Sequence, residues 1–138
     1  MKPIKDLPIA VAFVWRGEEI LLLQRKDKTP AWDKKWEFPG GKIDDGEKPA
    51  ETVVREVLEE TGLTIFDTKL IGNHTHDWDV FTDKILRVHL HCFSCQANDN
   101  RVILETDKAY THVWVNPKKA LEFDLLEANA DIIRKFVL

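Results

Sequence analysis

The first forty residues alternate between apolar runs and short polar breaks. Residues 9–15 form an almost unbroken apolar run, typical of a buried strand. Residues 16–19 predict a turn and residues 20–23 a returning strand, so that the two strands make a hairpin. Residues 27–35 are polar and predict a loop. Residues 36–38 predict a short extended segment, which a Pro-Gly-Gly sequence ends.

Helical spacing replaces this pattern over residues 48–61. Pro49 suits the first turn of a helix, and Gly62 suits its C-terminal cap. Four residues of this segment are expected to share one face of the helix: Val54, Val57, Leu58 and Thr61.

Three more strands are expected near residues 68–78, 85–96 and 109–115, and a terminal helix over residues 126–138. The order of strands, helix, strands, helix predicts an α+β fold. We expect an α/β/α sandwich, in which a mixed sheet is flanked by the helix over 48–61 and the C-terminal helix. Residues 1–138 are expected to form one domain.

Composition narrows the function classes. The 138 residues carry a formal net charge of −4, whereas a protein that grips a nucleic-acid polymer is more often basic. No run of 18 apolar residues is present, so we expect no contact with a membrane. The N-terminus lacks the apolar core of a secretory signal, and two cysteines make no disulfide framework. A cytoplasmic location is therefore expected by default.

Cysteines and histidines give a second set of candidate metal ligands, which we discount. Cys92 and Cys95 lie three positions apart on an expected strand and would point to opposite faces. The histidines at 74, 76, 89 and 91 alternate along expected strands, where they more often form a polar face than a metal site.

Three glutamates on the expected helix carry the main chemical signal. Glu56, Glu59 and Glu60 are spaced i, i+3 and i+4, so they project from one side and repel one another. Mg²⁺ compensates such a cluster well, because it prefers carboxylate oxygens and water. Gly40 and Gly41 precede the helix in a tight loop that can approach a ligand closely and offer a carbonyl to the metal. Arg55 and Glu47 are spaced to support the acids.

The segment over residues 41–63 resembles the Nudix box. Gly41, Glu47, the Arg55-Glu56 pair, the Glu59-Glu60 pair and Gly62 stand at the positions that the box demands. The resemblance implies hydrolysis of a diphosphate linked to another group, with Mg²⁺ or alternatively Mn²⁺ as cofactor.

By the same resemblance, Gly40 (through its carbonyl), Glu56, Glu59 and Glu60 are the metal ligands. Glu56, or a glutamate from a later loop, acts as the base. Glu105 is our candidate in that loop, with Asp107 beside it, and an ordinary polar loop is the alternative. Arg55, Glu56, Glu59, Glu60 and Glu105 together form the predicted catalytic set.

Outside the box the chain resembles the MutT-type branch, which removes oxidised purine nucleoside triphosphates. The resemblance implies a set of substrate contacts: Arg25, Lys26, Glu37, Phe38, Phe81, Lys84 and Asn129. Asn129 stands where the branch reads the base, and its alternative roles are a helix cap or a surface residue. Lys26 and Lys84 replace arginines of the branch and lose their bidentate geometry. Trp32 either stacks on a base or packs on the sheet.

The leading hypothesis is Mg²⁺-dependent hydrolysis of a nucleoside triphosphate, such as 8-oxo-dGTP, to the monophosphate and pyrophosphate. One alternative is a Nudix hydrolase for ADP-ribose, a dinucleotide or a pyrimidine triphosphate. Another is a non-catalytic nucleotide-binding module, which we would expect to have lost acids from the box. The expected partner is a small nucleotide or other diphosphate substrate, and the chain is an enzyme under the first two hypotheses.

Overall fold

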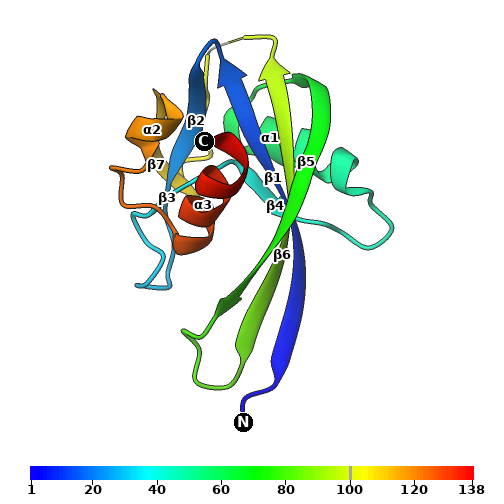
Figure 1. The fold of residues 1–138 in the computed structure, drawn as a ribbon, viewed down its shortest axis with the longest axis vertical. Coiled ribbons are helices and arrows are strands. Elements are labelled where there is room, and N and C mark those ends of the chain that lie inside the picture. Colours follow the sequence, from blue (N-terminus) through cyan, green and yellow to red (C-terminus); the bar gives the residue numbers. More distant parts are fainter. Residues whose placement is uncertain (100) are drawn as a thin grey trace.

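A computed structural model describes residues 1–99 and 101–138. Within these residues seven strands form one mixed sheet, and helices cover both of its faces (Figure 1). The strands are β1 (Ile4–Arg16), β2 (Glu19–Arg25), β3 (Trp36–Glu37), β4 (Gly40–Lys42), β5 (Ile65–Trp78), β6 (Ile85–Ala97) and β7 (Ala109–Val115). The helical segments are α1 (Pro49–Thr61), α2 (Pro117–Ala120), α3 (Glu127–Ile132) and the π-helical turn η1 (Ile133–Val137).

β1 is the axis of the sheet. It pairs in parallel with β6 from Ile4 opposite Ile85 to Trp15 opposite Gln96. Its other edge is shared, because β4 pairs with its middle and β2 with its end. β5 extends the sheet beyond β6, and β3 and β7 flank β2. The Pro39-to-Gly41 segment therefore enters the sheet where β1 changes partner.

Strand alternation along β1 divides the core into two layers. Val11 and Phe13 face the layer that contains α3, whereas Ala10, Ala12 and Val14 face the layer that contains α1. The small alanines leave room for Val53 and Val57 of α1, which are fully buried. The two layers match the opposite placement of α1 and α3 in Figure 1, and the expected mixed sheet between two helices is confirmed.

Several boundaries and one helix face differ from expectation. β1 and β5 begin earlier than the sequence pattern indicated, because exposed residues interrupt the periodic signal near the start of each strand. The terminal helix is not continuous, since α3 gives way to η1 after Ile132. Val54 and Leu58 are 39% and 50% exposed, so their expected place on the packed face of α1 is wrong.

The buried line of α1 consists of Val53, Val57 and Thr61, which are spaced i, i+4 and i+8. Val54 and Leu58 are rotated by one residue from this line and face solvent. Gly62 ends the helix with φ 73°, a left-handed conformation that glycine adopts without strain, as expected.

We predict that Val57→Ala lowers the free energy of unfolding by about 1–3 kcal/mol, because a fully buried side chain is truncated. Leu58→Ala, on the next position of the same helix, should change it by less than about 0.5 kcal/mol. Urea unfolding of both variants measures the difference, and equal losses would contradict the assigned packing face.

Candidate active site

Two glycines bring the loop before α1 against both the sheet and the helix. A Cβ atom at Gly40 would collide with the Ala10 carbonyl oxygen and would lie 2.8 Å from Val11 Cα. A Cβ atom at Gly41 would collide with the Glu56 carboxyl group. Only glycine permits this double contact, so the loop passes directly between β1 and the acidic side of α1.

Glu60 is the most deeply buried acid of the box. Its Oε1 accepts a hydrogen bond from the Gly40 N–H at 2.8 Å. Burial raises the pKa of its carboxyl well above the usual range, and the negative charges of Glu37, Glu56 and Glu105 raise it further. A carboxyl group among like charges with one N–H donor is a site that a cation would stabilise.

Arg55 links the remaining acids of the box. Its guanidinium donates to both carboxylate oxygens of Glu47, at 2.8 and 2.9 Å, and to Glu56 Oε1 at 2.9 Å. A longer contact of 3.3 Å reaches Glu59. The hydrogen bonds from Arg55, and then the one from the Thr52 hydroxyl, lower the pKa of Glu47 to about 2. The supporting pair expected between Arg55 and Glu47 is therefore present.

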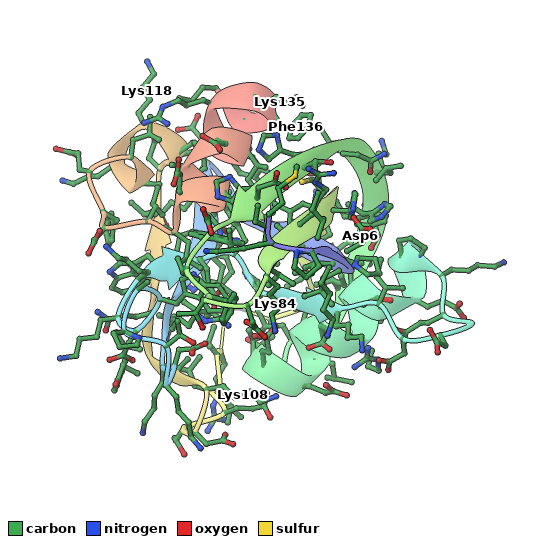
Figure 2. The ribbon with its side chains drawn as sticks, turned by 90° about the horizontal axis from the view of Figure 1, so that it is seen from below. Asp6, Lys84, Lys108, Lys118, Lys135 and Phe136 are labelled. Carbon is green, nitrogen blue, oxygen red and sulfur yellow. The ribbon has the colours of Figure 1, made fainter. Side chains whose placement is uncertain are left out.

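The three predicted ligand side chains do not yet converge on one point. Glu56 is drawn to Arg55, Glu60 to Gly40, and Glu59 is half exposed. Burial raises the pKa of Glu56. The hydrogen bond and the positive charge of Arg55 lower this pKa, and the like charge of Glu59 raises it. The oxygen-only donor set and the charge around Glu60 nevertheless fit a hard divalent cation. The positive charge of Lys108 also lowers the pKa of Glu56, and Figure 2 shows Lys108 on the side of α1.

A cavity opens beside the glycine loop. Its volume of about 150 Å³ is roughly ten times the space that one water molecule needs, so it can hold a ring. Gly40 and Gly41 form the end next to α1, and Asn129 and Trp32 contribute other walls. The remaining lining residues are Leu7, Ile9, Val11, Arg25, Glu37, Phe38, Trp78, Leu86, Val88, Leu90, Leu126 and Ala128.

Asn129 is neither a helix cap nor a surface residue. It lies within α3, is 8% exposed, and its Oδ1 accepts a hydrogen bond from the Phe38 N–H at 2.9 Å. This bond fixes the orientation of the amide, since the N–H needs an acceptor. Phe38 is itself held edge-to-face on Phe13, with ring centroids 4.6 Å apart.

Arg25 lines the cavity, but its charge is already paired. Its guanidinium donates to Glu37 Oε1 at 2.9 Å and to Asp27 Oδ2 at 2.7 Å, and it lies 5.3 Å from the Trp32 ring centroid. Burial raises the pKa of Glu37, while Arg25 opposes that rise. Arg25 and Glu37 thus form one polar unit on the cavity wall.

Besides Arg55 and the acids of the box, four predicted site residues lie outside the cavity lining. Lys26 is exposed, donates to the Thr106 carbonyl and lies over Tyr110. Lys84 lies over Phe81, whose ring packs edge-to-face on Trp32 at 5.7 Å, so both border the cavity only through Trp32. The Glu105 N–H donates to the Glu60 carbonyl at 3.4 Å, which places its loop beside the box.

The sequence did not single out Trp78, which lines the cavity at the end of β5. It packs edge-to-face on Trp32, with centroids 5.5 Å apart. Trp32 therefore packs on the sheet and also faces the cavity. Its indole Nε1 is buried and has no hydrogen-bond partner among the described residues. In the sequence, Trp32 and Trp78 lie at the ends of separate segments, and only the fold brings the two rings together.

The chain is similar to known proteins in both sequence and fold. The NUDIX domain model matches residues 6–136. The CTP pyrophosphohydrolase of Escherichia coli (strain K12) is 28% identical over 134 residues, which cover 97% of this chain and 93% of that protein. The "Putative 8-oxo-dGTP diphosphatase" of Bacillus subtilis (strain 168) is 53% identical over 101 residues, 73% of this chain and 60% of that protein. The crystal structure of the MutT protein from Methanosarcina mazei Go1 has a TM-score of 0.82 at 28% identity, covering 99% of this chain and 94% of that one.

The mixed sheet between two helices, with an acidic helix against a glycine loop, is the architecture of Nudix hydrolases, a class that generally uses divalent metal ions. The chain belongs to the Nudix family, because the family model spans almost all of it. It is a Nudix diphosphohydrolase of MutT-like type, as its sequence indicated. Within the described residues, no helix is long and apolar enough to cross a membrane.

We predict that Glu47 supports the fold only above acidic pH. Its pKa in the folded protein is about 2, below the ordinary value of 4.5, so its contribution is present above pH 4.5 and is lost as the pH falls toward 2. Glu47→Gln should therefore lower the melting temperature at neutral pH, and the two melting curves should approach each other over that acidic range. Glu18→Gln, an exposed turn position, is the control; a constant difference between wild type and Glu47→Gln would contradict the role of the pair.

Proposed function

We propose that the protein hydrolyses a nucleoside triphosphate, with Mg²⁺ as cofactor, to a nucleoside monophosphate and pyrophosphate. The observation that carries the proposal is that Gly40 and Gly41 line the cavity and also contact the Glu60 and Glu56 side chains of α1. A base held in the cavity would leave its phosphates beside the acids. The proposed products then require cleavage between the α- and β-phosphates.

We assign the cation to Glu56, Glu59, Glu60 and the Gly40 carbonyl. Mg²⁺ at this site supplies positive charge that offsets the negative charge of both the phosphates and the helix acids. Arg55 keeps Glu56 in place while Glu47 holds Arg55. Mn²⁺ is the alternative ion for the same oxygen ligands.

The reaction adds water across one anhydride bond. The water oxygen forms a bond to one phosphorus, and the bond between that phosphorus and the bridging oxygen breaks. The bridging oxygen leaves with the other phosphate, and a base accepts one proton from the water. Glu56 and Glu105 are the candidate bases, because Glu56 stands against Gly41 and the Glu105 loop is hydrogen-bonded to Glu60. A carboxylate must come within about 3 Å of the water to accept its proton.

Support for an oxidised purine such as 8-oxo-dGTP comes from the name of the Bacillus subtilis relative and from Asn129. With Oδ1 bonded to Phe38, the Asn129 amide retains its Nδ2 donor, which suits a carbonyl oxygen of a base. The unpartnered Trp32 Nε1 is a second donor on the cavity wall. Phe81, Lys84 and Lys26, which lie outside the cavity lining, would contact the parts of the nucleotide that extend out of the cavity.

A pyrimidine triphosphate is the second candidate. The CTP pyrophosphohydrolase of Escherichia coli is similar to this chain over 97% of its length, and cytosine also offers a carbonyl oxygen to a donor. A nucleotide panel that includes 8-oxo-dGTP, dGTP and CTP, scored for pyrophosphate release, separates the candidates by their kcat/KM values.

We predict that Glu59→Gln lowers Mg²⁺-dependent kcat at least about 100-fold, because a ligand of the cation loses its charge. The half-exposed side chain carries no buried contact, so the melting temperature should stay close to that of the wild type. Activity within threefold of the wild type would remove Glu59 from the ligand set.

We predict that Asn129→Asp raises the KM of the preferred nucleotide about tenfold, because it replaces the Nδ2 donor with an acceptor. The variant keeps an oxygen for the Phe38 N–H, whereas Asn129→Ala also leaves that buried N–H unpaired and should cost about 1–3 kcal/mol of stability. The measurement compares 8-oxo-dGTP, whose base carries carbonyl oxygens, with dATP, whose base carries none. An equal effect on both nucleotides would remove Asn129 from base discrimination.

A further inference from the structure

A second cluster of ligand-type side chains lies under α3, away from the glutamate box. His74 and His76 are on the face of β5 that packs toward α3, because they stand opposite Leu90 and Val88 of the α3-side core. His89 and His91 stand opposite Thr75 and Asn73 and therefore face the other side of the sheet. The fold thus separates the four histidines into two pairs.

Asp131 of α3 completes the cluster. Its Oδ2 lies 3.5 Å from His74 Nε2 and 3.7 Å from His76 Nδ1. The side chains of His74 and His76 are only 19% and 12% exposed. His74 Nε2 is buried and forms no hydrogen bond within the part of the chain that the structure describes. The two imidazoles and the carboxylate thus converge at distances longer than a hydrogen bond, and a bound ion between them would satisfy the buried nitrogen.

The two separations from Asp131 Oδ2 match those between ligands of a tetrahedral ion. With metal–nitrogen and metal–oxygen distances of about 2.0–2.2 Å, two ligand atoms at the tetrahedral angle are roughly 3.4 Å apart. A direct hydrogen bond would be shorter, at about 2.7–3.2 Å. Among the described residues, this is the only group of three His, Cys, Asp or Glu side chains whose ligand atoms all lie within 4.8 Å of one another.

We propose that His74, His76 and Asp131 bind one divalent transition-metal ion of the class of Zn²⁺ and Co²⁺, with water at the fourth position. Two imidazole nitrogens favour such an ion over Mg²⁺, which prefers oxygen ligands. The site is therefore chemically distinct from the carboxylates of α1. Lys135 is the nearby cation that opposes binding, and its Nζ is engaged with the Asn73 carbonyl at 3.3 Å.

The ion would fasten α3 and η1 to β5 next to the cavity. Phe136 already packs on Gly72, where a Cβ atom would lie 2.5 Å from its ring, and Lys135 reaches the next residue of β5. Figure 2 shows both side chains at the end of this helical segment. Asp131 would add a third attachment two residues after Asn129, and His76 packs edge-to-face on the cavity residue Trp78 at 4.5 Å. The metal would thereby hold the wall that carries Asn129.

Co²⁺ titration of metal-free protein, in excess Mg²⁺ to occupy the oxygen sites, tests the proposal. We expect one Co²⁺ per chain with the intense visible absorption of a four-coordinate site, and the same spectrum for Glu59→Gln. His76→Gln and Asp131→Asn should weaken binding at least about tenfold. His89→Gln, on the opposite face of the sheet, is the matched control and should bind as the wild type does.

Zn²⁺ should also raise the melting temperature of the wild type and of His89→Gln, but not that of Asp131→Asn. Melting curves without metal establish that each variant is folded, and either His76→Gln or Asp131→Asn alone suffices for the test. No saturable Co²⁺ binding by the wild type, or undiminished binding by a folded variant, would overturn the proposal. Neither readout uses a nucleotide, so the result is independent of the proposed hydrolysis.

Discussion

The close approach of the Gly40–Gly41 segment to β1 and α1 is the constraint on which the site depends. On one side the segment lies against the Ala10 backbone, and on the other against the Glu56 carboxyl. Its N–H also holds Glu60, and both glycines border the cavity. A side chain at Gly40 would collide with the β1 backbone, and one at Gly41 would displace the Glu56 carboxyl group. Two residues without side chains therefore keep the acids next to the cavity.

The acidic side of α1 is tolerated because the opposite side is firmly packed. Like charges one helical turn apart destabilise a helix by only about 0.2–0.5 kcal/mol per pair. Burial of a valine side chain contributes about 1.5–3 kcal/mol, and α1 buries both Val53 and Val57 completely. Arg55 further reduces the repulsion at Glu47, Glu56 and Glu59. The helix can therefore hold carboxylates close together before any cation is bound.

Features that depend on neighbours in the sequence were predictable. The Arg55–Glu47 pair follows from the short separation of Glu47 from the helix start, the Gly62 cap from the end of the helical pattern, and the hairpin of β1 and β2 from a short polar break. The packed face of α1 was not predictable, because its apolar residues extend over two sides and the sheet decides which side is buried. Thr61 and Val57 were assigned correctly, whereas Val54 was not.

Contacts between distant segments could not be read from the sequence. Trp32 meets Trp78 only because the loop before β3 folds over the end of β5. Asp131 meets His74 only because α3 crosses the same strand, and a histidine pair on a strand carries no sign of a third ligand on a helix. The sequence pattern indicated an alternating polar face there, which holds for His89 and His91 but omits the helix above His74 and His76.

Chemistry and substrate choice are encoded in different parts of the chain. The box supplies the acids and the glycine loop, and relatives that carry different substrate names share the family fold. The cavity walls instead come from the strands, the loop before β3 and α3. The Phe38 N–H orients Asn129, so its remaining donor faces a fixed direction only as long as α3 keeps its place on β5. The proposed base contact at this residue therefore depends on the packing of a short helix of six residues on the sheet, and not on the glutamate box.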